Sequence, residues 1–226
     1  MSAVGVAALH KRYPSKAGWV EALHDVSFSL PAGTLGCVVG PSGSGKSTLL
    51  GLVGGLDTPT AGAITVGTFG LHRMTAAERG RFRTARVGFI FQSNNLIPVL
   101  TASENVALPL SLGTLTKGER ARRVAVLIDE LGLGLLADRR PGELSGGQQQ
   151  RVGIARALVT QPMLVLADEP TAHLDAQTGR DVMDVLRAAS RKHATTFLVA
   201  THDADVEARA DVRVTLRDGS CVAAAA

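Results

Sequence analysis

A run of glycine and serine with a single lysine, GPSGSGKST, occupies residues 40–48 and could bind phosphate. Its glycines let the backbone curl so that successive amides point at one anion, and Lys46 can bring a full positive charge to the same place. The Ser47 hydroxyl is suited to Mg²⁺. The segment fits the pattern G-x-x-x-x-G-K-[S/T], and it lies between an apolar run and a helical one, which is the context of a phosphate-binding loop. We therefore predict a nucleoside triphosphate with Mg²⁺ as its ligand. The predicted loop consists of Gly40, Pro41, Ser42, Gly43, Ser44, Gly45, Lys46, Ser47 and Thr48.

A second apolar run, LVLADE at 164–169, ends in two carboxylates. In α/β proteins, ligands bind at the sheet edge formed by the carboxyl ends of the strands, so Asp168 and Glu169 are expected beside the phosphate loop. We predict that Asp168 holds the metal ion, usually through water, and that Glu169 polarises the attacking water. An acidic pair at a strand end is more often plain surface, and this pair gains its significance only from sharing a sheet with the loop.

The nucleobase of the bound nucleotide is predicted to be adenine, because the Asn-Lys-x-Asp element with which GTPases select guanine does not occur in the sequence. ATP is therefore the expected nucleotide. Tyr13, one of few aromatic residues, is the candidate ring to stack on the adenine. The alternative reading is that Tyr13 is a half-buried tyrosine of a flanking sheet.

The segment ELSGGQQQRVGIARAL, residues 143–158, has the pattern of a helix that begins unusually. Ser145 and Gln148 fit a capping box, in which each side chain bonds the other residue's backbone amide. Gly146 and Gly147 then occupy the first turn, although each glycine costs a helix about 1 kcal/mol relative to alanine. A plain cap explains the serine and the glutamine but gives no reason for the two glycines.

Strand and helix patterns alternate along the chain, which argues for a mostly parallel sheet with helices on its faces. Apolar runs predict strands at 35–40, 87–92, 163–168 and 195–202, and a hairpin near the end turns at Asp218-Gly219. Between 101 and 160 the strand pattern disappears, and Thr116-x-x-Glu119 begins one helix there. We predict one domain over 1–226, with a core at about 33–92 and 161–226. A small antiparallel β part covers about 1–32 and 61–70, a helical part about 93–160, and the AAAA terminus frays.

Composition narrows the setting of the protein. No stretch approaches the roughly 20 apolar residues that cross a bilayer, and the N-terminus lacks the pattern of a signal peptide. Two cysteines without a metal or redox motif suit a reducing cytosol, with Cys37 in a buried strand. The net charge is +4, and the densest basic group is Arg79, Arg81, Arg83 and Arg86. We interpret that group as a solvated helix face rather than a nucleic-acid patch.

With these segments identified, nearly the whole chain resembles the ATP-binding subunit of an ABC transporter. GPSGSGKST resembles the Walker A motif, FQ at 91–92 the Q-loop, LSGGQQQR at 144–151 the signature motif and LVLADEPT the Walker B motif. AHLD at 172–175 is similar to the D-loop, and TH at 201–202 to the switch histidine. The segments LLGLVGGLDTPTAG and GFIFQSNNLIPVLTASENVALPL resemble more narrowly the lipoprotein-release (LolD-like), macrolide-efflux (MacB-like) and cell-division (FtsE-like) group.

The resemblance implies a role for several further residues and a fold. The fold would be that of P-loop (RecA-like) nucleoside triphosphatases. Gln92 would sense Mg²⁺ and the γ-phosphate and couple them to a membrane partner, so that Ser47, Gln92 and Asp168 surround the metal. His202 would hold the γ-phosphate and the attacking water in line. The D-loop departs from this group's usual pattern at Ala172 and His173, and His173 has no assigned role.

The family also implies that two such chains close head to tail on two ATP molecules. The partner would be a second copy or a homologous subunit, and each signature motif would then complete the other chain's site. Ser145, Gly146, Gly147 and Gln148 would act in trans, and Asp175 would cross to the other phosphate loop. A β-carbon at either glycine would obstruct the approaching phosphate, which would explain their presence in the helix.

The leading functional hypothesis is an ATPase that drives a separate membrane permease, of an export or extraction type, which it contacts through about 93–101. Such a subunit would lie in the cytoplasm on the inner face of the plasma membrane. The alternative is a cell-division type of complex that transmits force or signal and moves no substrate. A soluble family member that acts on DNA or ribosomes ranks lowest. Only 145 − 40 = 105 positions separate the Walker A and signature motifs, which leaves no room for a long coiled coil.

Overall fold

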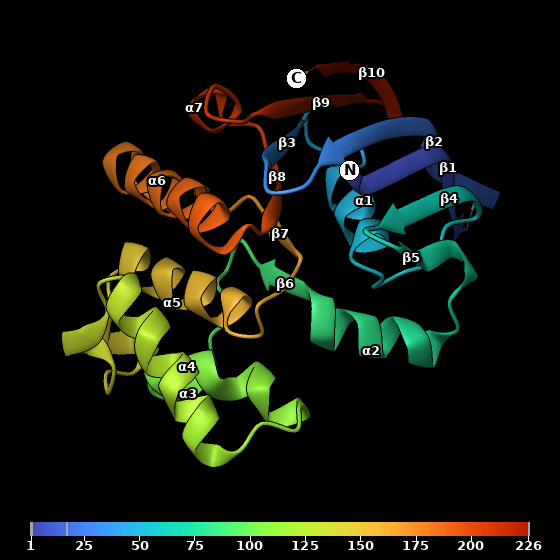
Figure 1. The fold of residues 1–226 in the computed structure, drawn as a ribbon. Coiled ribbons are helices and arrows are strands. Elements are labelled where there is room, and N and C mark those ends of the chain that lie inside the picture. The colour runs from blue at the N-terminus through green and yellow to red at the C-terminus, as the bar shows by residue number, and fades with distance from the viewer. Residues whose placement is uncertain (1, 17, 226) are drawn as a thin grey trace.

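The computed structural model describes residues 2–16 and 18–225, so that Met1 and Ala226, the ends of the predicted domain, lie outside it. The strands form two sheets, one of four strands in the order β2-β1-β4-β5 and one of six in the order β10-β9-β3-β8-β7-β6 (Figure 1). The strands are β1 Ser2–Ser15, β2 Gly18–Pro31, β3 Leu35–Val39, β4 Ala61–Val66, β5 Phe69–Gly70, β6 Val87–Ile90, β7 Leu164–Asp168, β8 Thr196–Thr201, β9 Val212–Arg217 and β10 Ser220–Ala225.

Seven α-helices occur in the described part of the chain, joined by short 3₁₀ turns. The α-helices are α1 Lys46–Val53, α2 Ala76–Arg86, α3 Ala102–Ala107, α4 Lys117–Glu130, α5 Gly146–Leu158, α6 Ala176–His193 and α7 Ala204–Glu207. The 3₁₀ turns are η1 Leu71–Arg73, η2 Leu108–Leu112, η3 Gly134–Leu136 and η4 Pro141–Glu143. Within the described ranges, no helix combines the length and the apolar character that crossing a membrane requires.

The six-stranded sheet is the mostly parallel core that the alternating pattern predicts. β6, β7, β8, β3 and β9 run parallel, and β10 alone returns antiparallel to β9. At the centre of the sheet both faces are buried: β3 and β8 are buried at every position, whereas β9 alternates between buried and more exposed residues. Successive side chains of a strand point to opposite sides of the sheet. On β8, Leu198 and Ala200 join the core that contains α1 and the four-stranded sheet, while Phe197 and Val199 join the core that contains α5 and α6. This double burial explains why the strands appear in the sequence as continuous apolar runs.

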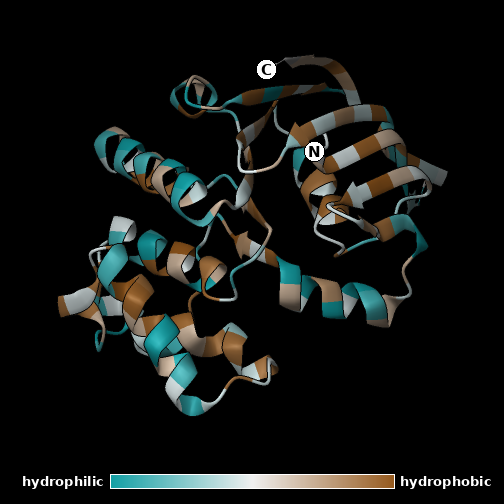
Figure 2. Cartoon of the chain, viewed as in Figure 1, coloured by the Kyte–Doolittle hydropathy of each residue, from teal (hydrophilic) through white to brown (hydrophobic). Residues whose placement is uncertain are grey.

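The four-stranded sheet is antiparallel and covers one side of α1 (Figure 1). Polar and apolar residues alternate along β1, β2 and β4 in Figure 2, as expected for strands with one buried face. Val4, Val6 and Leu9 of β1 point inward and pack in the same core as Leu49 and Leu52 of α1. The helix that begins in the phosphate loop is therefore held between the two sheets.

Local capping signals set where the helices of the middle region begin. The predicted boxes at Thr116 and Ser145 are confirmed. Each of these side chains accepts from the amide three residues on, and the backbone amide of the same residue donates to the side chain of that later residue. Thr75 and Thr101 form two further boxes with Glu78 and Glu104, which the sequence analysis missed. The same local pattern identifies all four.

Two details differ from or refine the sequence predictions. The terminal alanines were expected to fray, but Ala223 and Ala224 pair with β9 as part of β10. That prediction is therefore wrong for the described residues.

Cys37 is buried in β3, as predicted, and burial raises the pKa of its thiol to about 11, which keeps it protonated and unreactive.

The basic group of α2 is largely occupied within the molecule. Arg79 donates to the carbonyl of Met74 at 2.7 Å and Arg83 to that of Gly55 at 2.5 Å. The Arg86 guanidinium lies 5.8 Å from the centre of the Phe69 ring. Three of these arginines thus have contacts within the molecule, so the predicted solvated helix face is only partly solvated: Arg81 and Arg86 are exposed, and Arg79 and Arg83 are half-buried.

Candidate nucleotide site

A cavity of about 660 Å³ brings together segments from six parts of the sequence. It lies where the phosphate loop, the ends of β6, β7 and β8, the strand β2 and the β9–β10 turn meet. Its lining comprises Val20, Glu21, Ala22, Ser42, Gly43, Gly45, Lys46, Ser47, Thr48, Gln92, Asp168, Glu169, His202, Asp218 and Gly219. Residues separated by 202 − 42 = 160 positions therefore face one space, as the parallel topology requires.

The phosphate loop has the geometry of an anion cradle. Gly45 precedes α1 with φ 100°, and no side chain caps the first amides of the helix. Gly43 also has positive φ, and a β-carbon built on it would meet no atom within 4 Å. The Lys46 ammonium is buried below the loop and donates to the carbonyls of Gly40 at 2.7 Å and Pro41 at 3.1 Å. Free amides, a helix dipole and a fixed cation converge here.

The C-terminal hairpin supports this loop from behind. A β-carbon on Gly40 would lie 2.2 Å from the carbonyl oxygen of Leu216 in β9, so only glycine allows the strand so close. The amide of Gly219 donates to the carbonyl of Ser44 at 3.2 Å, and the Gly219 carbonyl accepts from His24 of β2 at 2.8 Å. The sequence predicted the hairpin but gave no sign of this contact with the loop.

The predicted catalytic pair lies at the carboxyl edge of the sheet. His202 Nδ1 and Glu169 Oε1 are 2.8 Å apart, after the ends of the neighbouring strands β8 and β7. Glu169 adopts a left-handed backbone, with φ 47°, and its amide donates to the carbonyl of Ala200 at 2.9 Å. Such a conformation is strained for a residue other than glycine and is characteristic of functional sites. Asp168 precedes it as the last residue of β7 and lines the same cavity.

The predicted metal ligands share the cavity and fit a hard cation. Ser47, Gln92 and Asp168 offer a hydroxyl, an amide carbonyl and a carboxylate, which are oxygen donors of the kind Mg²⁺ takes, together with water and nucleotide phosphates. The described residues contain no group of three or more histidine, cysteine or acidic side chains placed to hold a metal by themselves. With these oxygen donors, Ser47, Gln92 and Asp168 could hold Mg²⁺ together with the phosphates of a nucleotide.

Tyr13 is placed beside the cavity but does not belong to its lining. Its hydroxyl donates to Asp57 Oδ2 at 2.9 Å, and the Lys11 ammonium lies 4.7 Å from the centre of its ring. Burial, with the Asp57 hydrogen bond, raises the pKa of the Tyr13 hydroxyl. The tyrosine is part of the flanking sheet and 36% exposed, so the ring has an open face, and its stacking on adenine stays a prediction.

The signature segment lies outside this cavity. Ser145 and Gly146 are exposed at the start of α5, consistent with a surface that another chain could reach. The structure also supplies an internal reason for one glycine. A β-carbon on Gly147 would lie 2.5 Å from Cγ2 of Thr178 in α6, and one on Gly146 would lie 3.2 Å from Leu174. The packing of α5 against α6 therefore explains Gly147 without any phosphate, a contact that the sequence analysis did not consider.

Asp175 and His173 also have partners within the chain that the sequence did not reveal. Asp175 is the N-cap of α6 and accepts from the amides of Gln177 and Thr178. The hydrogen bond from the Thr178 hydroxyl, with those amides, holds its pKa below the usual value. His173 Nδ1 lies 3.3 Å from the carbonyl oxygen of Gln92, so the D-loop touches the Q-loop.

Taken together, a parallel sheet, a glycine-rich loop with a buried lysine and an acid at a strand end define a P-loop nucleoside triphosphatase. Residues 23–172 match the family described as ABC transporter. The chain therefore belongs to the ABC transporter family. It contains the ATP-binding domain of that family, so it is an ABC ATPase. The family match ends before Asp175 and His202.

Solved structures extend the similarity to almost the entire chain. The ATP-binding cassette MJ0796, in a dimeric post-hydrolysis state bound to ADP and Pi, is 37% identical with a TM-score of 0.88. The alignment covers 98% of this chain and 97% of that one. A second dimeric structure of MJ0796, described as a bacterial ABC transporter cassette, matches equally. CbiO1 from Clostridium perfringens, part of the ABC transporter complex cbiONQ, is 26% identical over 99% of this chain and 88% of its own, with a TM-score of 0.89.

Proposed function

We propose that this protein is the ATP-hydrolysing subunit of a membrane transporter and drives a separate permease of an export or extraction type. The observation that carries the proposal is the meeting of Lys46, Glu169 and His202 around one cavity. Those residues supply a cation for the phosphates, a base for water and a partner for that base. A single cassette over 1–226, divided as the sequence predicts, would contain this whole machinery.

In the proposed reaction the protein mainly positions groups and stabilises charge, as in other phosphoryl transfers. The amides after Gly43 and the Lys46 ammonium would hold the β- and γ-phosphates. Bound Mg²⁺ would neutralise charge on those phosphates, with Ser47, Gln92 and Asp168 beside it. Glu169 would accept a proton from the attacking water. His202 would keep the carboxylate oriented while it holds the γ-phosphate end of the site.

We further propose that two chains close head to tail on two ATP molecules. The dimeric state of the 37% identical MJ0796 cassette with ADP and Pi supports this arrangement. The exposed start of α5 also supports it, since Ser145 and Gly146 lie at the surface and outside the cavity of their own chain. The partner's nucleotide would thus be served by Ser145, Gly146, Gly147 and Gln148. Asp175 would approach the partner's phosphate loop.

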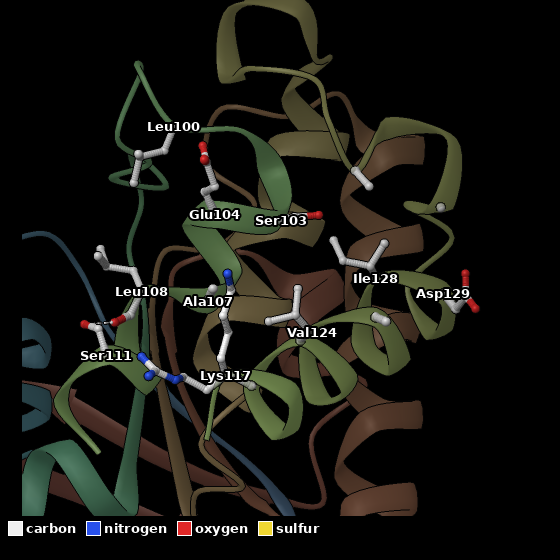
Figure 3. Close-up of a pocket in the computed structure, with 15 residues that line it drawn as sticks. Leu100, Ser103, Glu104, Ala107, Leu108, Ser111, Lys117, Val124, Ile128 and Asp129 are labelled. Carbon is white, nitrogen blue, oxygen red and sulfur yellow. Dashed lines mark hydrogen bonds between the residues drawn. The ribbon is translucent and has the colours of Figure 1, made fainter. Parts of the chain in front are cut away.

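The permease would bind along the segment 93–101 and the groove beside it. A groove of about 860 Å³ opens between α3 and α4 and is predominantly apolar. In Figure 3, Leu100, Leu108, Val124 and Ile128 line it, with Glu104 and Lys117 among its charged residues. An amphipathic helix of a partner could bury its apolar face there.

Such an attachment would hold the protein in the cytoplasm at the inner face of the plasma membrane. We assign the protein to the lipoprotein-release, macrolide-efflux and cell-division group as part of this proposal, because the segments LLGLVGGLDTPTAG and GFIFQSNNLIPVLTASENVALPL resemble that group.

The variant Glu169→Gln tests the proposed chemistry. It keeps the size and the hydrogen-bonding reach of the side chain but removes the base. We expect ATP binding near the wild-type level, hydrolysis reduced by at least about a hundredfold, and an ATP-bound dimer that accumulates in size-exclusion chromatography. Asp205→Asn, on the short surface helix α7, is the matched control and should hydrolyse ATP normally.

The outcomes separate the parts of this proposal. Hydrolysis near the wild-type rate in Glu169→Gln would mean that Glu169 is not the base. Loss of hydrolysis without a dimer at saturating ATP would contradict the head-to-tail arrangement and leave the base assignment standing. Copurification with a membrane protein tests whether a separate permease binds this chain. The variant Leu108→Asp, which places a charge in the apolar groove, should copurify less of that protein than the wild type.

A further inference from the structure

The turn that follows Gln92 has a backbone conformation that needs outside support. Asn94 and Asn95 both have left-handed φ, 57° and 48°. The amide of Asn94 donates to the carbonyl of Phe91 at 3.0 Å, and that of Asn95 to Ser93 at 2.6 Å. Asparagine tolerates this region better than most residues, but it still prefers right-handed or extended backbone. Two such residues in succession imply a contact that stabilises the turn.

Arg156, in the last turn of α5, provides that contact. Its Nη1 donates to the carbonyl of Asn95 at 2.7 Å and its Nη2 to the carbonyl of Asn94 at 2.5 Å. The planar fork of a guanidinium reaches two neighbouring acceptors at once, which a lysine ammonium does less well. Burial lowers the pKa of Arg156, and no carboxylate forms an ion pair with it in the described part of the chain. The hydrogen bonds to the two turn carbonyls are therefore the main interactions that offset the desolvation of the Arg156 guanidinium.

The same helix carries the signature residues at its other end. α5 has 13 residues and begins at Gly146, directly after Ser145. At a rise of about 1.5 Å per residue it is a rod of roughly 20 Å. Its buried side chains, among them Val152 and Ile154, pack in the core, so it moves as a rigid element. Arg156 thus connects the Q-loop turn to the helix that presents Ser145.

We propose that Arg156 is a positioning residue that fixes the turn after Gln92, so that Gln92 approaches the nucleotide only together with α5. The inference rests on the role of Gln92 in the proposed function. His173, through its contact with the Gln92 carbonyl, holds the turn from the D-loop side. Engagement of Mg²⁺ and the γ-phosphate by Gln92 is then transmitted through Arg156 to the signature end of α5. The start of α5, which is proposed to serve the partner's nucleotide, is thereby linked through the Arg156 side chain to the nucleotide site of its own chain.

A double-mutant cycle between Arg156 and Gln92 tests the proposal. Arg156→Met keeps the length of the side chain without its donors, Arg156→Lys keeps the charge, and Gln92→Ala removes the group that Arg156 is proposed to position. Steady-state ATPase kinetics give kcat, the KM for ATP and the Mg²⁺ dependence of each variant. We expect Arg156→Met to lower kcat by about tenfold, the equivalent of one lost charged hydrogen bond, with little change in KM. Arg156→Lys should recover part of the loss.

The decisive result is the behaviour of Arg156→Met in the Gln92→Ala background. If Arg156 acts through Gln92, the second substitution adds little, and the two effects do not multiply. A full further tenfold loss in that background would overturn the inference while leaving the role of Gln92 intact. Unchanged kinetics of Gln92→Ala alone would instead contradict the Gln92 assignment in the proposed function. Arg122→Met, at an exposed position on α4, controls for loss of an arginine and should be kinetically normal.

A second pair of variants perturbs the turn without touching Arg156, in case Arg156→Met folds poorly. Asn95→Val opposes the left-handed conformation, because a β-branched residue is strongly disfavoured there, whereas Asn95→Gly permits it. The proposal requires that Asn95→Val reproduce the kcat loss and that Asn95→Gly retain clearly more activity. Equal activity of the two variants would show that the conformation of the turn does not matter, and the proposal would fail.

Discussion

At the scale of single residues, the structure distinguishes two reasons for a glycine at the start of α5. The sequence suggested room for a phosphate from another chain. The geometry shows that Gly147 also lies against Thr178, whose Cγ2 atom would be 2.5 Å from a β-carbon. Gly146 has more space, with Leu174 at 3.2 Å. A residue that approaches a ligand in one state can thus be required by packing in every state.

The packing reason predicts that Gly147→Ala is destabilising in the isolated chain. We expect a loss of about 1–3 kcal/mol in the free energy of unfolding, the usual result of overpacking, measured by urea denaturation without nucleotide. Thr178→Ser removes only the methyl group that would clash and keeps the hydroxyl bonded to Asp175. The double variant should therefore recover most of the stability. Gly118→Ala on α4, where a β-carbon meets nothing within 4 Å, is the control and should not destabilise.

Glu169 illustrates what residue types alone can predict. Its place after an apolar strand predicted a carboxylate at the sheet edge, and the structure puts it in the cavity with His202. Its left-handed backbone could not be predicted, because nothing local to Asp168-Glu169 demands it; the amide is held by Ala200 of the neighbouring strand. The contact between His173 and Gln92 is equally non-local and carries no pattern in the sequence.

At the scale of elements, β1 and the loop after α1 are joined by a polar cluster. Lys11 Nζ lies 2.7 Å from Asp57 Oδ2 and donates to the carbonyl of Thr58 at 2.8 Å, while Tyr13 donates to the same carboxylate. Burial would raise the pKa of Asp57, but the hydrogen bonds from Lys11, Thr58 and Tyr13 outweigh it and hold the pKa below its usual value. The cluster ties the four-stranded sheet to the end of the helix that follows the phosphate loop.

This cluster predicts a specific dependence of stability on pH. Because the pKa of Asp57 is lower in the folded state, its contribution is present above the unfolded value of about 3.9 and is lost as pH falls further. The difference in unfolding midpoint between the wild type and Asp57→Asn should be constant from about pH 7 to 5 and shrink below about pH 4. Lys11→Met should show the same trend. A difference that grows on acidification would contradict the assignment.

Elements were predicted well where their signal is local. The capping boxes at Thr116 and Ser145 lie within four residues, and the strands of the core are short apolar runs between turns. The pairing of those strands has no such signal. β3 lies between β8 and β9, and Arg156 reaches carbonyls about 60 residues earlier in the chain. These relations arise from packing of the complete fold.

At the scale of the whole molecule, the proposed site needs a second chain. Ser145→Arg would place a bulky cation at the exposed start of α5, where the partner's nucleotide is proposed to bind. We expect ATP binding by the monomer near the wild-type level and loss of the ATP-dependent dimer in the Glu169→Gln background, measured by light scattering. Arg140→Lys, a nearby exposed position, should dimerise normally. A dimer of normal affinity in Ser145→Arg would refute the trans arrangement.

The β9–β10 turn should affect nucleotide affinity from behind the loop. Gly219 has φ 78°, and a β-carbon would lie 2.9 Å from the carbonyl oxygen of Ala22. Gly219→Val should displace the turn from Ser44 and raise the Kd for ATP by roughly tenfold, about 1.4 kcal/mol. Gly33→Val introduces similar backbone strain, with φ 71°, away from the loop. That control should lower stability without changing ATP affinity, measured by isothermal titration.

The position of β3 has a consequence for how the protein is made. Val39 leads into the phosphate loop, yet its strand pairs with β8 at Thr201 and β9 at Thr215, which are 201 − 39 = 162 and 215 − 39 = 176 residues later. At about 5–20 residues per second, a ribosome needs roughly 10–35 s to synthesise that stretch. A nascent chain that has not yet reached β8 and β9 therefore carries the loop sequence without the strands that shape it, and its capture of ATP has to wait until both strands have been made.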